Sequence, residues 1–175
     1  MRKLLFGLAA LALAAPAPAA LPAGATAPDF VTTGAKAGKP FRLHLRRELR
    51  KGPVVLYFFP KAFTTGCTLE ARAFSEAVKE FRKAGAQVIG LSADDLPTLK
   101  RFSVEGCRNA FPVATATRDV IRAYDVEWKQ KPQLTNRTSY VIDKRGRIIL
   151  VHSDLDWSGH VAKTLAAIKS LKFKG

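Results

Sequence analysis

One of the two cysteines follows a strongly apolar segment, and its position suggests chemistry. Residues 54–59 are six apolar side chains in a row, Pro60 ends the run, and Cys67 comes after a short loop. The run predicts a buried parallel strand, and Cys67 is expected in the first turn of a helix. There the helix dipole and the unpaired backbone N–H groups favour a thiolate. Because ligands bind at the carboxyl ends of strands in open α/β sheets, Cys67 is expected to be a reactive thiol.

Other interpretations of the two cysteines stay open. Cys67 could be an inert buried thiol, which is the usual state of a free cysteine. In an oxidising compartment it could pair with Cys107, either as a structural disulfide or as a redox couple. The three histidines, His44, His152 and His160, lack ligand-type spacing with either cysteine. We therefore predict neither a metal site nor another cofactor.

The rest of the pattern predicts one α/β domain, a central mixed sheet flanked by helices on both faces. This order of elements is that of a thioredoxin-like fold. The predicted strands are 54–59, 87–92, 111–113, 139–142 and 148–152, and a hairpin turn is expected at 38–40. The predicted helices are 45–51, 68–84, one capped by Asp94 and Asp95, 120–124, and 159–171, whose apolar face carries Val161, Leu165, Ile168 and Leu171.

The helix that follows Cys67 is expected to be amphipathic. Its apolar stripe begins at Leu69 and continues through Phe74 and Phe81, while Glu70 belongs to the charged face. Gly85 is expected to end it.

The first twenty residues are typical of a secretory signal. Arg2 and Lys3 precede the apolar residues 4–15, which are too few to span a bilayer. A small-residue pattern follows, which predicts cleavage after Ala19 or Ala20 and export, most simply to a periplasm. A buried amphipathic helix fits less well because the segment has no polar face. Residues 1–20 are thus predicted to be the signal and residues 21–175 the domain.

The net charge of +15 permits binding to anionic surfaces. The basic residues are dispersed, however, and no nucleic-acid motif accompanies them. We therefore predict a solvated basic surface, no nucleic-acid partner and no stable membrane insertion. The local cluster consists of Arg42, Arg46, Arg47, Arg50 and Lys51.

Three segments together resemble a known family. Pro60-x-x-x-Thr64-x-x-Cys67 is similar to the peroxiredoxin active-site signature, and the surrounding residues resemble the bacterioferritin-comigratory, or peroxiredoxin Q, branch. Residues 24–30 resemble the N-terminal segment of the family, and residues 137–143 resemble the segment that carries its active-site arginine. The resemblance runs from about Gly24 to the last helix.

The resemblance implies a thiol-specific peroxidase for hydrogen peroxide and organic hydroperoxides, reset by a thioredoxin-like protein or a small thiol. Cys67 would attack the peroxide and become a sulfenic acid. Arg137 would favour the thiolate and hold the peroxide, and Thr64 would hydrogen-bond both. Backbone N–H groups near Gly66 would stabilise the leaving oxygen, and Pro60 would shield the thiolate. The resemblance leaves a monomer or a weak dimer open.

Each of these roles has a simpler alternative. Thr64 could only cap the helix, and Arg137 could be a surface arginine at the start of a strand. Pro60 ends a strand in either case.

The chain departs from the branch at the resolving cysteine. The commonest arrangement places it five residues after the first, where this chain has Arg72. Some members carry it on the next helix, and Cys107 is expected late on that helix. We favour a disulfide between Cys67 and Cys107, which would require local unwinding of the first helix. An enzyme with one catalytic cysteine and an inert Cys107 are the alternatives.

Two other functions stay open. A thiol–disulfide oxidoreductase normally needs Cys-x-x-Cys, and Glu70 stands where the second cysteine would be. A non-enzymatic basic binding or holdase module has only the charge in its favour.

Overall fold

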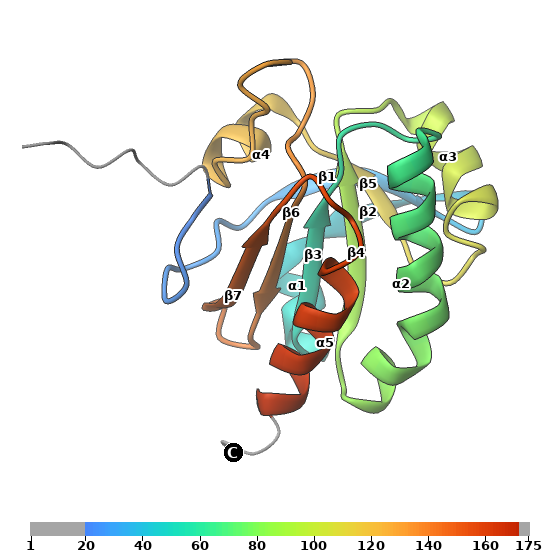
Figure 1. Ribbon diagram of the computed structural model, residues 1–175. Coiled ribbons are helices and arrows are strands. Elements are labelled where there is room, and N and C mark those ends of the chain that lie inside the picture. Colours follow the sequence, from blue (N-terminus) through green and yellow to red (C-terminus); the bar gives the residue numbers. More distant parts are fainter. Residues whose placement is uncertain (1–19, 172–175) are drawn as a thin grey trace, which may run out of the picture.

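The computed structural model describes residues 20–171, which form a seven-stranded mixed sheet with helices on both faces (Figure 1). The sheet order is β2-β1-β5-β4-β3-β6-β7. The strands are β1 (Val31–Lys36), β2 (Lys39–His44), β3 (Val54–Phe58), β4 (Gln87–Ser92), β5 (Val113–Thr115), β6 (Thr138–Ile142) and β7 (Ile148–Ser153). The helices are α1 (Leu45–Lys51), α2 (Thr65–Lys83), α3 (Leu96–Glu105), α4 (Arg118–Ala123) and α5 (His160–Leu171). The predicted thioredoxin-like fold is confirmed, whereas segment 1–19 of the predicted signal lies outside the described residues.

Strand β3 explains the apolar run that precedes the cysteine loop. It pairs in parallel with β4 and antiparallel with β6. Val54, Leu56 and Phe58 face the core beneath α1 and α4, whereas the alternate side chains face the core beneath α2, α3 and α5. Since helices cover both faces of the sheet, every residue of the strand must be apolar. Figure 1 shows α2 and α5 on one face and α1 on the other.

Helix α2 shows that the predicted apolar stripe was wrong in its first turn. Leu69 is 39% exposed, whereas Glu70 is fully buried. The buried positions instead begin at Cys67 and continue through Glu70, Ala71 and Phe74. They keep helical spacing, but Glu70 is an acidic residue, which is buried because it binds Arg137 just before β6. Gly85 follows the helix with a φ of +79°, which a glycine adopts without strain.

Helix α3 ends before the second cysteine. It begins as expected, because the Asp95 side chain accepts a hydrogen bond from the backbone N–H of Thr98 (2.9 Å). It ends at Glu105, so the prediction that Cys107 lies late on this helix is wrong. Cys107 occupies the turn that follows, and its N–H donates to the Phe102 carbonyl (3.0 Å).

The predicted apolar face of α5 was also wrong in part. His160, Thr164 and Ile168 are its buried residues, whereas Val161 and Leu165 are half-buried. The strand predicted at 111–113 starts two residues later, as β5. Within residues 20–171, none of the helices combines the length and the hydropathy that crossing a bilayer requires.

Candidate active site

The loop from β3 to α2 is held by Asp94, at the end of the neighbouring strand. Its carboxylate accepts hydrogen bonds from the Ala62 N–H (2.7 Å) and the Ser92 hydroxyl (2.8 Å). Pro60 is buried where the loop leaves the sheet. Phe63 has a φ of +64°, a conformation that is strained for an aromatic residue. The loop that precedes the first turn of α2 is therefore held in place by Asp94 and strained at Phe63.

Cys67 is the third residue of α2 and is almost fully buried. The Arg137 Nη2 group lies 3.5 Å from the Cys67 sulfur and donates a hydrogen bond to it. Two segments that are seventy residues apart in the sequence thus meet at one thiol. The predicted neighbourhood of Cys67 and Arg137 is present in the structure, and Arg137 is not a surface residue.

The Arg137 guanidinium is fixed by two further hydrogen bonds. Its Nε donates to the Leu155 carbonyl (2.9 Å), and its Nη1 donates to the Glu70 carboxylate. Burial alone would lower the pKa of Arg137, but the negative charges of Glu70 and of the Cys67 thiolate raise it above its ordinary value. Arg137 is thus held as a fixed cation beside the sulfur.

Glu70 is the buried acid of this site. Burial raises its pKa to about 8, even though the Arg137 charge and hydrogen bond act in the opposite direction. The guanidinium faces two acidic groups, Glu70 and Cys67, and can neutralise only one of them. Removing Arg137 would leave Glu70 without its cation, so the two residues act as one unit.

Thr64 and Gly66 precede Cys67 in the chain and have different environments. Thr64 is the N-cap residue of α2, but its exposed hydroxyl donates to the Lys61 carbonyl (3.0 Å) and makes no capping bond. Its predicted contact with a peroxide stays a prediction. A Cβ atom at Gly66 would lie 3.3 Å from Arg137 Nη2 and 3.8 Å from the Trp157 ring. A side chain here would crowd the guanidinium, so the glycine permits its close approach.

Cys107 is buried on the same side of the sheet as Cys67, and both are free thiols. Burial raises the pKa of the Cys107 thiol. The Cys107 carbonyl accepts a hydrogen bond from the Ser75 hydroxyl of α2 (2.8 Å). Ser75 is eight residues after Cys67, which is roughly 12 Å along the helix axis. Since a disulfide needs Cα atoms within about 7 Å, we expect the chain to move before the two cysteines pair.

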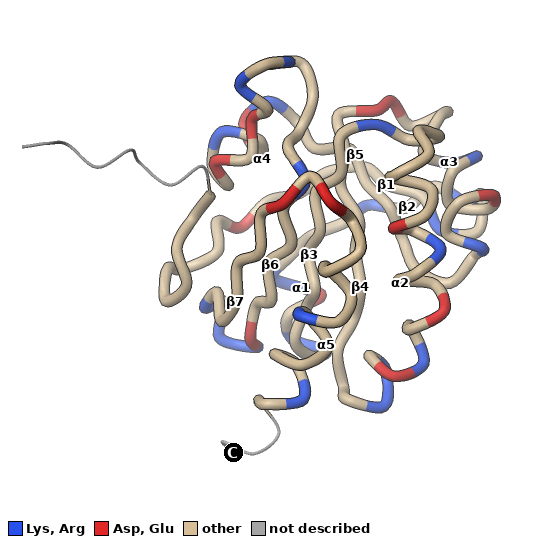
Figure 2. The backbone as a smooth tube through the Cα atoms, in the orientation of Figure 1, with Lys and Arg blue, Asp and Glu red and all other residues tan. Residues whose placement is uncertain are grey.

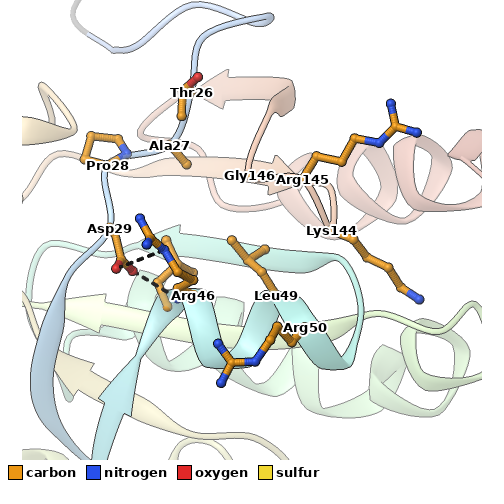
Figure 3. Close-up of a pocket in the computed structure, with 11 residues that line it drawn as sticks. Thr26, Ala27, Pro28, Asp29, Arg46, Leu49, Arg50, Lys144, Arg145 and Gly146 are labelled. Carbon is orange, nitrogen blue, oxygen red and sulfur yellow. Dashed lines mark hydrogen bonds and ion pairs between the residues drawn. The ribbon is translucent and has the colours of Figure 1, made fainter.

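A basic hollow of about 330 Å³ lies apart from this site, between α1 and the turn after β6. Figure 3 shows Arg46 turned toward Asp29, to which its Nε is ion-paired (3.4 Å). Arg50, Lys144 and Arg145 extend in different directions and do not converge on one point (Figure 3). Figure 2 likewise shows basic residues scattered over many elements, with acidic residues among them. The hollow therefore belongs to a dispersed basic surface.

Comparison with known proteins identifies the family. The sequence model described as the AhpC/TSA family matches residues 23–151. The chain belongs to this family. Peroxiredoxin Q, chloroplastic, of Sedum lineare is 33% identical over 150 residues, 85% of this chain and 78% of that protein. The protein of the same name from Populus jackii is 36% identical over 124 residues, 68% of this chain and 56% of that protein.

Solved structures agree with this peroxiredoxin assignment. Peroxidoxin BcpB of Mycobacterium tuberculosis superposes with a TM-score of 0.75 at 33% identity, over 85% of this chain and 97% of that one. Peroxiredoxin Q of Xanthomonas campestris gives a TM-score of 0.68 at 28% identity, over 79% of this chain and 89% of that one. The chain is a thiol peroxidase of the peroxiredoxin Q branch.

Sequence reasoning missed several residues around the thiol of this peroxiredoxin. Glu70 was assigned to the solvent face because it is charged. Leu155, which binds Arg137 through its backbone, and Trp157, which lies next to Gly66, belong to the segment between β7 and α5. A backbone carbonyl has no sequence signature. The charge of Glu70, at helical spacing from Cys67, was the one available signal.

Proposed function

We propose that this peroxiredoxin reduces hydrogen peroxide and small organic hydroperoxides through Cys67. The observation that carries the proposal is the Arg137 guanidinium fixed 3.5 Å from the Cys67 sulfur at the start of α2. Both the cation and the helix N-terminus favour the thiolate over the thiol. The thiolate attacks one peroxide oxygen and the O–O bond breaks. Cys67 becomes a sulfenic acid, and the other oxygen leaves as water or an alcohol after taking up a proton.

The neighbouring residues support this reaction in separate ways. Arg137 and the backbone N–H groups at Gly66 and Cys67 stabilise negative charge on the leaving oxygen. The Thr64 hydroxyl is exposed three residues before Cys67, and we propose that it turns from the Lys61 carbonyl to a bound peroxide. Buried Pro60 limits the access of water to the sulfur.

Cys107 is proposed to resolve the sulfenic acid. Its thiol attacks the oxidised sulfur, a disulfide forms and water leaves. The first turns of α2 must loosen for this step, because the Ser75 hydrogen bond holds the Cys107 backbone roughly two helical turns from Cys67. A thioredoxin-like protein with two thiols, or two equivalents of a small thiol, then reduces the disulfide and is itself oxidised to a disulfide.

Intact mass spectrometry after one equivalent of peroxide tests both steps. The wild-type chain is expected to lose two hydrogen atoms as the disulfide forms. The Cys107→Ser variant is expected to gain one oxygen atom on Cys67, or the adduct of an added sulfenic-acid trap. Gain of one oxygen in both proteins would contradict the role of Cys107 and leave an enzyme with one catalytic cysteine. No mass change in either protein would contradict the role of Cys67.

Export is proposed from the sequence of residues 1–20. Cleavage after Ala19 would retain Ala20, which is buried, and Leu21, whose N–H donates to the Tyr140 hydroxyl (3.1 Å). We expect the protein recovered from the periplasm of a Gram-negative expression host to begin at Ala20 or Leu21. The intact mass of that fraction measures this directly, and a mature chain that retains Met1 would contradict it.

A further inference from the structure

His160, the first residue of α5, is fully buried and makes hydrogen bonds through both ring nitrogens. Its Nε2 lies 3.0 Å from the Asp154 carbonyl, and its Nδ1 lies 2.8 Å from the Ser139 hydroxyl. A carbonyl only accepts, so Nε2 carries the proton and Nδ1 of a neutral ring accepts from Ser139. The orientation of the imidazole is therefore fixed by its two partners.

The Nδ1 side of this ring faces the buried acid of the active site. The Glu70 Oε1 atom lies 3.6 Å from His160 Nδ1, and within the described residues it has no hydrogen-bond partner. The other oxygen of Glu70 holds Arg137. Burial lowers the pKa of His160 to about 4, whereas it raises that of Glu70 to about 8. His160 is therefore the weaker base of the two, and its neutral ring faces the Glu70 carboxyl group.

The Nε2 atom of the ring binds the segment that contributes the other hydrogen bonds to Arg137. The Asp154 N–H donates to the backbone carbonyl of Arg137 (3.1 Å), and the Leu155 carbonyl accepts from its Nε (2.9 Å). His160 Nε2 binds the carbonyl between these two groups. One imidazole is thus connected to both partners that fix the guanidinium.

We propose that His160 is a positioning residue, which holds the Arg137 guanidinium against the Cys67 sulfur through Glu70 on one side and through Asp154 and Leu155 on the other. The inference deepens the proposed function and rests on it. His160 touches neither the sulfur nor the expected position of a peroxide, so its effect is transmitted through Arg137. The charged or titratable groups that surround it are Glu70, Arg137, His152, Asp154 and Asp156.

Two substitutions test separately the contact of His160 with Glu70 and its hydrogen bond to the Asp154 carbonyl. His160→Gln can place an amide N–H near the position of Nε2, so it keeps the bond to Asp154 and loses the contact with Glu70. His160→Asn reaches only the position of Nδ1, so it keeps the Glu70 side and loses Asp154. His152 is the matched control, because its ring lies 4.5 Å from that of His160. Its hydrogen-bond partner is Lys163 and not a group that binds Arg137. We expect His152→Asn to behave like the wild type.

The measurement is the alkylation rate of Cys67 as a function of pH, read on the Cys67 peptide by mass spectrometry. A displaced guanidinium stabilises the thiolate less, so the midpoint of the profile is expected to move about one unit upward, and the rate at pH values below that midpoint to fall about tenfold. The second-order rate constant for peroxide should fall by the same factor. A role confined to folding would lower the melting temperature and leave the midpoint unchanged.

Unchanged midpoints in folded His160→Gln and His160→Asn would overturn the inference. If neither variant folds, Ser139→Ala provides the test, because it removes the Nδ1 partner and leaves the histidine in place. This variant is expected to move the midpoint upward and to lower the alkylation rate a few-fold. An unchanged midpoint would again overturn the inference. Alkylation needs no peroxide, so loss of the proposed peroxidase activity in the wild type would be recognised separately.

Discussion

Replacement of Cys67 by serine is expected to reduce peroxide consumption to the rate of a protein-free control. Loss of a catalytic nucleophile commonly costs many orders of magnitude, and a fall of at least about a thousandfold is expected here. A serine hydroxyl stays protonated at neutral pH and, unlike sulfur, does not accept an oxygen atom from peroxide. The measurement is peroxide loss with a thiol donor present, at matched protein concentration.

The matched control for this change is Cys107→Ser. It removes the other free thiol but leaves Arg137 and Cys67 in contact, so one equivalent of peroxide should still be consumed at the wild-type rate. Consumption that survives in Cys67→Ser and disappears in Cys107→Ser would assign the nucleophile to Cys107 instead.

Replacement of Arg137 by methionine is expected to damage activity and stability together. The cation and one hydrogen-bond donor leave the sulfur, so the rate constant for peroxide should fall about a hundredfold. The same change leaves Glu70 buried in the core without its ion-pair partner. Removing one partner of a buried ion pair costs about 3–5 kcal/mol, and a proton on Glu70, which its raised pKa favours, would bring the loss toward the lower value. Urea unfolding and stopped-flow peroxide reduction measure the two effects.

The double variant Arg137→Met with Glu70→Gln separates these two effects. With both charges removed, no unpaired ion is left in the core, so most of the lost unfolding free energy should return. The rate should stay low because the sulfur still lacks its cation. Recovery of the rate along with the stability would show that Arg137 acts only through folding.

The fold could be predicted from local sequence patterns because each of the strongest patterns fits one type of secondary structure. A run of six apolar residues bounded by prolines can only be a buried strand, and the amphipathic stretch after it can only cross over one face of the sheet. The turn from Asp143 to Gly146 joins β6 to β7, with the Arg145 N–H bound to the Asp143 side chain (2.9 Å). The first residues shifted by two or three positions, to Thr65 in α2 and to Val113 in β5, because packing rather than propensity decides where an element begins.

The site was predictable only as far as its motif extends. Cys67 and Arg137 belong to segments with a recognisable pattern, and the structure places them in contact. Glu70 was misassigned because a charge in a helix is normally solvated, and only Arg137, 67 residues away, makes its burial tolerable. The role of His160 depends on a hydrogen bond to a main-chain carbonyl, which the sequence does not encode at any one position.

The fixed guanidinium between two acids also determines how charge moves during turnover. Before oxidation the Cys67 thiolate matches the positive charge of Arg137, and Glu70 can remain protonated. Once the sulfur becomes a neutral sulfenic acid, we expect Glu70 to lose its proton, because it is then the acidic group that can balance the guanidinium charge. The buried centre is thus expected to alternate between two states with one cation and one anion each. At neither stage does the protein have to keep an unmatched cation away from water.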